Sequence, residues 1–433
     1  MVAETFDRSL WSAITPPGPD LPSLRGEVTA DIVLVGAGYL GMTTALTLAA
    51  EGLTVALVEA REPGWGASGR NTGFVVPTLK KALSPANVRA AFGPRRGEAF
   101  SRMIGGSGTR LFELAREQGI EGAEQTGWLQ PAHSGAAMAA NAAQVAEWQA
   151  LGFDVRQLGR EDVAARTGMD GYHGAMLIPT GGQLNPLAYA RGLARACQQA
   201  GVRLFAASPV TGIARDGLGW RVSTPGGSVS APRAVLTTNA LVGRLCPAVD
   251  RAVIPTRSFQ IATQRFGAET QARVLPARSP VADTRRHLFA ARWSPDGRIV
   301  GGGLVHPGPG RLARTRRRFE QRFARFLPQL GPVRADYAWT GTVAVTLDAL
   351  PRLHRLGDGL WAPIACNGRG VALTGAFGHE LGRFLAGRVT AEEFVVPVTT
   401  PEPVPLRALA TLAPYAWLPW SEFRDRIEAE RPS

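Results

Sequence analysis

The spacing of apolar residues near the start of the chain predicts a strand, a helix and a second strand in succession. Residues 32–35 form an unbroken apolar run, which is typical of a strand covered on both faces. A glycine turn follows, and residues 42–51 have the composition of a buried helix that Gly52 ends. A second apolar run ends at Glu59, so this segment predicts a βαβ unit in a parallel sheet.

Three later segments also have a recognisable pattern. Residues 201–240 contain apolar strands and a hairpin at 225–227. Residues 365–387 contain a strand end, a glycine turn and a helix with one apolar face. Residues 311–330 place phenylalanines at helical spacing among arginines, which predicts an amphipathic surface helix with a solvated basic face.

The glycine turn between the first strand and the helix has the spacing GxGxxG. Gly36 permits the tight turn, Gly38 lets the backbone approach a pyrophosphate, and Gly41 allows the helix to pack closely on the strand. The N-terminal amides of the helix can then bind the phosphates. Glu59 is placed to bind ribose hydroxyls and would repel a 2′-phosphate, which argues against NADP. The segment therefore predicts a dinucleotide site.

The βαβ unit alone does not distinguish NAD from FAD, because both cofactors contain ADP. The following stretch, "AREPGWGASGRNTGF" at 60–74, is longer than the short link that a nicotinamide-binding unit needs. It is rich in glycine and could line a longer cofactor, which favours FAD. A surface loop without a ligand is the alternative interpretation.

The composition is that of an ordinary globular protein. The chain has 433 residues, 45% of them hydrophobic, which allows two or three domains and excludes a disordered or fibrous protein. The formal charge is +13, but only two of the 48 basic residues, Lys80 and Lys81, are lysines. Codon usage explains this skew better than polyanion binding, so we expect no nucleic-acid partner and no membrane association.

The cysteines and the N-terminus indicate the cellular compartment. Cys197, Cys246 and Cys366 lie far apart and lack the spacing of a metal site or a disulfide framework. The N-terminus lacks the basic and apolar regions of a secretory signal. We expect a cytoplasmic protein without a metal, either a monomer or a homo-oligomer.

Four segments of the chain form a recognisable set. They are the βαβ unit with "EAR" at 59–61, "GASGRNTG" at 66–73, "DTRRHLFAARWSPDGRIVGGG" at 283–303, and "YAWTGTVAVTLDALPRLH" at 337–354 with "ACNGRGVALTGAFGHELGRFLAG" at 365–387. In their order and spacing, these segments resemble the D-amino-acid oxidase (DAO) superfamily of FAD-dependent amine oxidoreductases, close to its γ-glutamylputrescine oxidoreductase-like branch.

The resemblance implies which residues contact FAD. The loop at 66–73 would cross the pyrophosphate and reach the flavin ring, although Thr72 stands where the family has glycine. The helix after 367–370 would direct its N-terminal amides and dipole at flavin N1 and O2. The implied cofactor-binding residues are Gly36, Gly38, Tyr39, Leu40, Gly41, Glu59, Ala60, Arg61, Ala67, Ser68, Gly69, Arg70, Asn71, Thr72, Val210, Asn367, Gly368, Arg369 and Gly370. Val210 is equally well explained as a core residue.

The resemblance also implies oxidation of a C–N bond in an amine or amino acid. The nitrogen must be unprotonated, and hydride transfer to flavin N5 would leave an imine without needing a strong base. His287, His306 and Arg286 are the catalytic candidates, since their segments resemble strands that face the flavin. Arg292 would bind a substrate carboxylate and Asp283 a second ammonium group, with surface ion pairing as the alternative for each.

The predicted fold is α/β, with a Rossmann-like FAD-binding domain of the glutathione-reductase type. An α+β substrate domain on a mostly antiparallel sheet is expected to intertwine with it. The FAD domain is assigned to 28–82, 152–245 and 335–392, and the substrate domain to 83–151 and 246–334. Residues 1–27 and 393–433 are assigned to terminal extensions, and the aromatic tail "PYAWLPW" would dock on the body or on a partner.

Several alternatives concern the electron acceptor and the reaction. Some relatives place a lysine above the flavin to activate oxygen, and the strand at 298–306 has none, so a dehydrogenase with another acceptor stands beside an oxidase. Covalent flavin is not expected, because "GASGRNTGF" and "WTGTVAVTLD" contain no cysteine or histidine. A flavin monooxygenase, an NAD-dependent dehydrogenase and a non-enzymatic binding module are the other interpretations.

Overall fold

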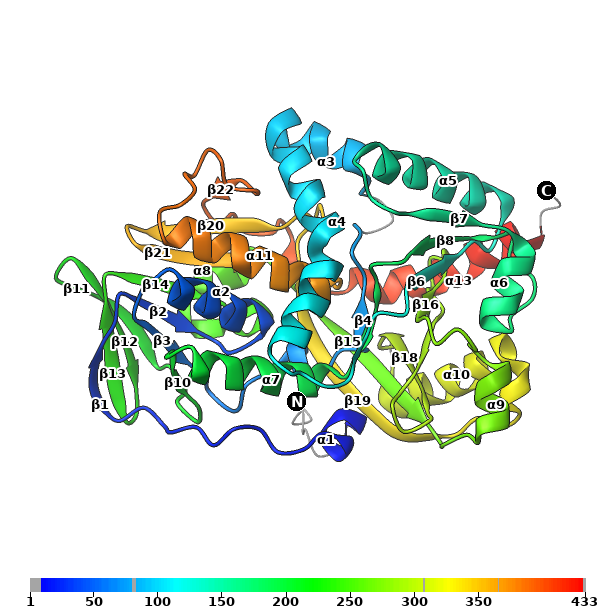
Figure 1. Cartoon of the computed structure of the whole chain (residues 1–433), viewed down its shortest axis with the longest axis horizontal. Helices are drawn as coiled ribbons and strands as arrows, with labels where there is room; N and C mark the ends of the chain where they lie inside the picture. Colours follow the sequence, from blue (N-terminus) through cyan, green and yellow to red (C-terminus); the bar gives the residue numbers. More distant parts are fainter. Residues whose placement is uncertain (1–8, 80–82, 307, 365, 431–433) are drawn as a thin grey trace.

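The computed structural model describes residues 9–79, 83–306, 308–364 and 366–430. Two large sheets lie side by side along the long axis of the molecule and form the frame of the site (Figure 1). One sheet is largely parallel and the other largely antiparallel, so the predicted fold class is confirmed.

The largely parallel sheet contains the predicted βαβ unit. Its strands, in spatial order, are β10 (Arg203–Phe205), β3 (Val55–Val58), β2 (Ile32–Val35), β14 (Arg233–Leu236), β21 (Leu360–Ile364), β20 (Arg352–Gly357) and β22 (Val398–Thr399). The first five run parallel, and β20 turns back antiparallel to β21. The helices α2 (Tyr39–Ala50), α7 (Pro186–Gln199) and α11 (Gly370–Leu385) cover one face.

The other face of this sheet is covered by a four-stranded sheet. Its strands are β1 (Gly26–Thr29), β13 (Gly227–Ala231), β12 (Gly219–Thr224) and β11 (Gly212–Asp216). The predicted hairpin at 225–227 is confirmed, because β12 and β13 pair antiparallel across it. Ile32 and Leu34 pack with the helices, whereas Val33 and Val35 pack with the small sheet. Burial on both faces explains why the strand has no polar alternation.

The second large sheet carries the substrate side of the molecule. Its strands, in spatial order, are β19 (Ala335–Val345), β15 (Ile254–Thr263), β18 (Ile299–Leu304), β17 (Ala290–Trp293), β16 (Val281–Ala282), β6 (Trp128–Pro131), β8 (Ala175–Ile178) and β7 (Arg156–Leu158). All neighbours pair antiparallel except β16 and β6. The helix α10 (Arg311–Phe326) buries Phe319 and Phe323 against this sheet, as its amphipathic pattern predicts.

The antiparallel sheet draws strands from both predicted domains, so the domain boundaries stay predictions. β7 and β8 lie within 152–245 and β19 begins at 335, yet all three belong to the antiparallel sheet. Their apolar pattern predicts a strand but does not identify the neighbouring strand, since pairing is decided by contacts far away in sequence. The segment after 393 is also more than an extension, because β22 joins the edge of the parallel sheet.

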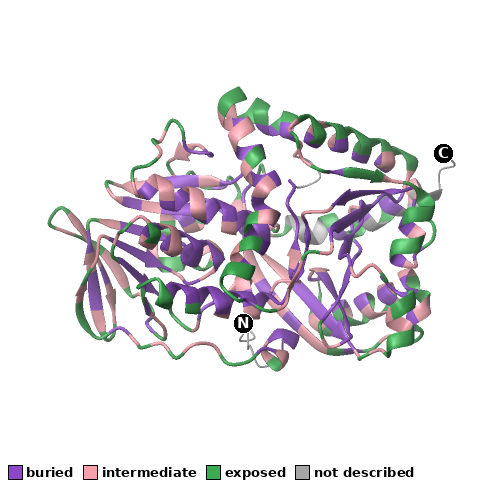
Figure 2. Cartoon of the chain, viewed as in Figure 1, coloured by how far each residue is buried: buried purple, intermediate pink, exposed green. Residues whose placement is uncertain are grey.

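The remaining elements surround the two sheets. They are α1 (Leu10–Ile14), α3 (Pro85–Phe92), α4 (Pro94–Glu117), α5 (Gly135–Ala150), α6 (Arg160–Thr167), α8 (Pro247–Arg251), α9 (Ala268–Arg273), α12 (Arg407–Ala410), α13 (Ala413–Glu430), and the three-stranded sheet of β4 (Phe74–Val75), β9 (Gly182–Leu184) and β5 (Ala123–Glu124). Buried residues gather in the strands and on the inward faces of the helices (Figure 2). Within the described residues, no helix combines the length and the apolar character needed to cross a bilayer.

Candidate active site

The glycine turn between β2 and α2 leaves no room for side chains. A Cβ atom at Gly41 would lie 2.1 Å from the carbonyl oxygen of Gly36 and 2.8 Å from Oγ1 of Thr237. Gly36 has φ of 107°, a conformation that favours glycine. Gly38 caps α2, and a Cβ there would lie 3.0 Å from Oγ of Ser68. The turn therefore brings bare backbone to the N-terminus of α2, as a phosphate-binding turn requires.

A cavity of about 570 Å³, here called cavity B, opens at this turn. Glu59 lines it, and its carboxylate accepts hydrogen bonds from the amides of Ala37 at 2.8 Å and Arg61 at 2.9 Å. Burial raises the pKa of this carboxyl, although both amides oppose the shift. The predicted cofactor residues Gly36, Gly38, Tyr39, Leu40, Glu59, Ala60, Arg61, Ala67, Ser68 and Val210 all line cavity B. Its volume, its glycine backbone and the carboxylate of Glu59 fit the ADP half of a dinucleotide.

The glycine-rich loop after β3 lies between cavity B and the substrate side. It begins with a 3₁₀ turn, Ala67–Gly69, in which Oγ of Ser68 accepts the amide of Tyr39 at 3.1 Å. The side chain of Asn71 closes the loop on itself, since it donates to the Ser68 carbonyl at 2.8 Å and accepts from the Gly73 amide at 2.7 Å. The loop is thus bound to the first turn of α2 and keeps one shape.

Consecutive carbonyls of this loop are held from the substrate side. The indole of Trp339 donates to the Arg70 carbonyl at 2.8 Å, and the indole of Trp11 donates to the Asn71 carbonyl at 2.8 Å. Nη1 of Arg292 donates to the carbonyls of Gly73 at 3.1 Å and Leu184 at 2.6 Å. Trp11 lies in the predicted N-terminal extension, so sequence analysis missed this support.

Arg292, the predicted carboxylate-binding residue, lies outside both cavities. Its side chain is 1% exposed, lines neither cavity, and stacks on the Trp11 ring at 5.2 Å. Burial lowers the pKa of its guanidinium to about 9. Its Nε and Nη1 donate to backbone carbonyls, so its function here is to position the loop that ends at Gly73.

We predict that Arg292→Met lowers the free energy of unfolding by about 2–4 kcal/mol, because buried carbonyls lose a charged donor. Urea denaturation with and without FAD measures this. The matched control is Arg265→Met, which removes an exposed partner of Asp296 at 3.1 Å and should cost less than about 1 kcal/mol. A variant that keeps wild-type stability would contradict the positioning role.

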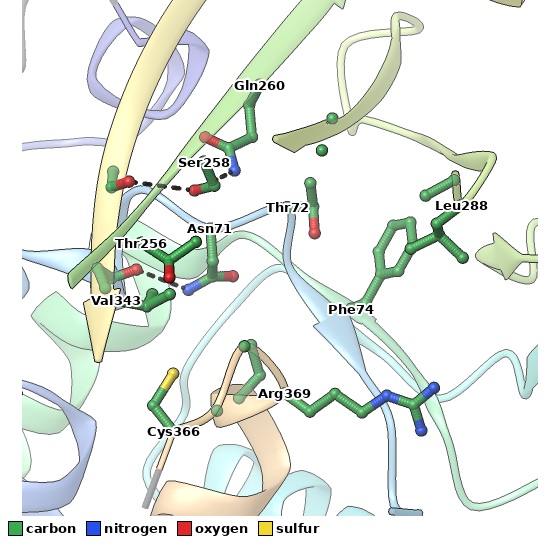
Figure 3. A pocket seen from close by; sticks show the side chains of 18 of the residues that line it. Asn71, Thr72, Phe74, Thr256, Ser258, Gln260, Leu288, Val343, Cys366 and Arg369 are labelled. Atoms are coloured by element: carbon green, nitrogen blue, oxygen red, sulfur yellow. Dashed lines mark hydrogen bonds between the residues drawn. The ribbon is translucent and has the colours of Figure 1, made fainter. Parts of the chain in front are cut away.

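A second cavity of about 400 Å³, here called cavity A, lies between the loop and the antiparallel sheet (Figure 3). Figure 3 shows Thr256, Ser258 and Gln260 on one side of it, with Phe74 and Leu288 across from them. The two cavities adjoin each other, because six residues line both: Tyr39, Ala67, Ser68, Asn239, Cys366 and Thr374. One long ligand could therefore extend from the glycine turn to the antiparallel sheet.

The turn before α11 forms another wall of cavity A. Gly368, with φ of 81°, Arg369 and Gly370 line the cavity, so the N-terminus of α11 opens onto it. Asn367 differs from the prediction. Its side chain is buried outside both cavities, and its Oδ1 accepts the Thr346 amide at 2.8 Å, which fixes the end of β19 to the turn.

The arginines Arg70, Arg286 and Arg369 line cavity A, whereas no carboxylate of the described residues does. Of these, Arg286 is paired with Asp425 and Glu428, which are not lining residues. Nε of Arg70 donates to the Trp65 carbonyl at 2.8 Å. The guanidinium of Arg369 stacks on the Trp128 ring at 5.4 Å and donates to a backbone carbonyl, and it has no acidic partner in the described part of the chain. Burial lowers its pKa to about 10, so it is charged at neutral pH.

The structure separates the predicted catalytic residues. His287 lines cavity A, and its amide donates to Asp425 at 2.9 Å. His306 does not line it and instead packs edge-on against the His287 ring, with centroids 5.6 Å apart. Arg286 lines the cavity, but Glu428 holds its guanidinium through two contacts of 2.7 Å. Of the three, His287 and Arg286 line cavity A, and the catalytic roles stay predictions.

Asp283, the predicted ammonium-binding residue, also lies away from the cavities. It is 2% exposed and lines neither cavity. Its carboxylate accepts from the Phe289 amide at 2.9 Å and the Tyr172 hydroxyl at 3.1 Å, and it pairs with Arg285. The carboxylate therefore stabilises the 283–289 turn.

Sequence analysis missed several residues of cavity A. Thr256, Ser258 and Gln260 alternate along β15, so the period of two was a usable signal for one face of a strand. Trp128 and the C-terminal residues Trp417 and Leu418 gave no comparable signal, because only the tertiary fold brings them to the cavity.

Fold and cavities together define a class, the oxidoreductases that hold a dinucleotide between a parallel sheet and an antiparallel substrate sheet. The chain matches the FAD dependent oxidoreductase (DAO) family over residues 31–383 and belongs to it. It is therefore an FAD-dependent oxidoreductase of the amino-acid and amine oxidase family, as the motif resemblance implies.

Individual relatives support this assignment. The chain is 28% identical over 374 residues to gamma-glutamylputrescine oxidoreductase of Escherichia coli (strain K12), covering 86% of this chain and 87% of that protein. Glycine oxidase from Geobacillus kaustophilus has a similar structure, with a TM-score of 0.68, 20% identity and coverage of 90% and 98%. L-proline dehydrogenase from P. horikoshii gives a TM-score of 0.71, 18% identity and coverage of 85% and 95%. The two structural likenesses concern the fold.

Proposed function

We propose that the protein binds FAD non-covalently and oxidises the C–N bond of an amine or amino acid that carries a carboxylate. The observation that carries this proposal is the guanidinium of Arg369. It lies on the wall of cavity A, beside the N-terminus of α11, without an acidic partner among the described residues. A planar guanidinium binds a carboxylate through paired hydrogen bonds, which fixes the position and orientation of the substrate.

The charges of cavity A also affect the reacting nitrogen. FAD, when bound, supplies the chemistry by accepting hydride from the carbon next to nitrogen, and an imine remains. The substrate must lose its ammonium proton first. Arg369 and Arg70 lower the pKa of a bound ammonium group, and no carboxylate in the described lining opposes this effect. Arg286 contributes less, because Asp425 and Glu428 pair with it. The same cationic lining disfavours a substrate with a second ammonium group.

Uncharged polar groups complete the binding surface. Ser258 donates to the Gly341 carbonyl at 3.2 Å and accepts from Gln260 at 3.1 Å, so this part of β15 is ordered before substrate arrives. Preordered polar groups reduce the entropy lost on binding. The name of the Escherichia coli relative, an oxidoreductase of a γ-glutamyl amine, agrees with an amine substrate.

Anaerobic reduction of the bound flavin tests the proposed function. Purified protein should be yellow and release FAD on heating or acid treatment, which separates non-covalent from covalent attachment. Amino acids should bleach the flavin without air and without NADPH, and the corresponding amino-acid amides should do so far less well. Equal bleaching by amides would contradict the carboxylate requirement, and a requirement for NADPH would favour a monooxygenase. Reoxidation by air or only by a dye then separates an oxidase from a dehydrogenase.

A further inference from the structure

The C-terminal helix α13 supplies part of the wall of cavity A. Trp417 and Leu418 line the cavity although the family match ends at residue 383. Leu418 is 2% exposed, whereas Trp417 is 46% exposed and Leu288, another lining residue, is 39% exposed. Residues that both line a cavity and reach solvent mark its mouth. The mouth of cavity A is therefore bounded by the 286–288 segment and by α13.

One stripe of α13 faces the body of the protein. Leu418, Ser421 and Asp425 are buried at helical spacing, and Glu428 continues the stripe. On the opposite side Phe423 is 62% exposed. The helix is thus seated in one orientation, and this orientation directs Leu418 into the cavity and leaves Trp417 at its edge.

Two acidic residues of this stripe, Asp425 and Glu428, attach α13 to the body of the protein. These contacts are here called the seat of α13. Asp425 accepts the amides of Arg286 at 3.0 Å and His287 at 2.9 Å. The carboxylate of Glu428 accepts hydrogen bonds from both terminal nitrogens of the Arg286 guanidinium, each at 2.7 Å. Paired charge-assisted hydrogen bonds of this kind are strong and directional. These hydrogen bonds join α13 to the 286–288 segment, which also lines cavity A. A shift of α13 would therefore move both sides of the cavity mouth.

We propose that α13 completes the substrate site and that Trp417 limits the size of the group that cavity A accepts. In this assignment Arg286 is a positioning residue, because its guanidinium holds the helix through Glu428 and Asp425. The inference rests on the proposed function in one respect, namely that cavity A is where the substrate binds.

His133, Asp425 and Glu428 also approach one another at metal-site spacing, but both carboxylates already pair with Arg286.

The seating of α13 should persist across the pH range in which amines are oxidised. The hydrogen bond from Arg286 holds the pKa of Glu428 below its usual value, with smaller effects from His133 and Arg424. A carboxyl whose folded-state pKa is lowered stabilises the fold above its ordinary pKa, and the effect disappears as pH falls through the lowered value. The helix therefore stays seated at neutral and alkaline pH.

Ligands of graded size test the inference without requiring turnover. The probes are acetate, benzoate and 2-naphthoate, together with the matched neutral amides, and binding is measured from the change in the absorbance spectrum of the bound flavin. Trp417→Ala should raise the affinity for 2-naphthoate relative to acetate by about tenfold or more, because the wall recedes at the mouth. The matched control is Phe423→Ala on the same helix, which should leave this ratio within about twofold.

A second variant tests the seat rather than the wall. Glu428→Gln should shift the size preference in the same direction as Trp417→Ala and should accelerate proteolytic removal of the C-terminal segment. Arg424→Ala is its control, since Arg424 also pairs with Glu428, at 3.6 Å, but does not line the cavity. Flavin content shows in each case that the protein is folded.

The outcomes separate this inference from the proposed function. If carboxylates bind wild-type protein no better than amides, the proposed carboxylate requirement fails. The three carboxylates, or the three amides, still differ in size and still test whether Trp417 limits the size of the ligand. If the size preference is the same in wild type, Trp417→Ala and Glu428→Gln, or if wild type shows no size-dependent binding, the inference about α13 is overturned.

Discussion

Gly38→Asp is expected to yield a folded protein that carries almost no flavin. Gly38 caps α2 and lines cavity B together with Tyr39 and Leu40, and even a Cβ atom at Gly38 would lie 3.0 Å from Oγ of Ser68. An aspartate would displace the loop that Ser68 begins and would place a negative charge where the pyrophosphate must bind. We expect FAD affinity to fall by about 10²-fold or more, because a charge-assisted interaction is replaced by a like-charge contact.

The ratio of flavin to protein absorbance measures this result, and far-ultraviolet circular dichroism shows whether secondary structure is kept. Gly106→Asp is the matched control. Gly106 lies within α4, and a Cβ atom built there has no neighbouring atom within 4 Å. It should retain wild-type flavin content. Undiminished flavin in Gly38→Asp would show that the dinucleotide does not bind at this turn.

The nucleotide side of the fold could be predicted because its signals are local. Gly36, Gly38 and Gly41 are close in sequence, and the apolar runs of β2 and β3 follow from burial on both faces. Each signal is complete within about thirty residues, as the βαβ rule expects. The same holds for the turn before α11, except that Asn367 faces β19 rather than a cavity.

The substrate side was less predictable because its residues are defined by partners far away in sequence. The charges of Arg292 and Asp283, and the resemblance of the segment that carries Arg286, predict roles in substrate binding and catalysis. Only the fold decides that Arg292 reaches Leu184, that Asp283 pairs with its own turn, and that Arg286 pairs with the C-terminal helix. A sequence pattern gives the chemical type of a side chain. Whether that side chain is free to bind a substrate depends on its tertiary contacts. The same reason explains why β8 could not be assigned to the antiparallel sheet.

Arg369→Met is expected to raise KM for an amino-acid substrate by about 10²-fold or more with a smaller change in kcat. Loss of one partner of a desolvated, hydrogen-bonded ion pair costs about 2–5 kcal/mol. The carboxylate contact is made equally in the ground state and in the transition state, so its loss falls mainly on KM. Arg369→Lys keeps the positive charge but lacks the planar pair of donors. Its KM should therefore lie between those of the wild type and Arg369→Met.

Steady-state kinetics with an amino acid and its amide measure the effect, and the amide should be nearly insensitive to the substitution. Arg383→Met is the matched control, because Arg383 is on the same helix, is half exposed and pairs with Glu380 at 3.4 Å. Sequence analysis assigned Arg369 to the cofactor, so flavin content distinguishes the two roles. If Arg369→Met loses FAD and leaves KM unchanged in reconstituted protein, Arg369 binds the cofactor, and the carboxylate must be bound elsewhere in cavity A.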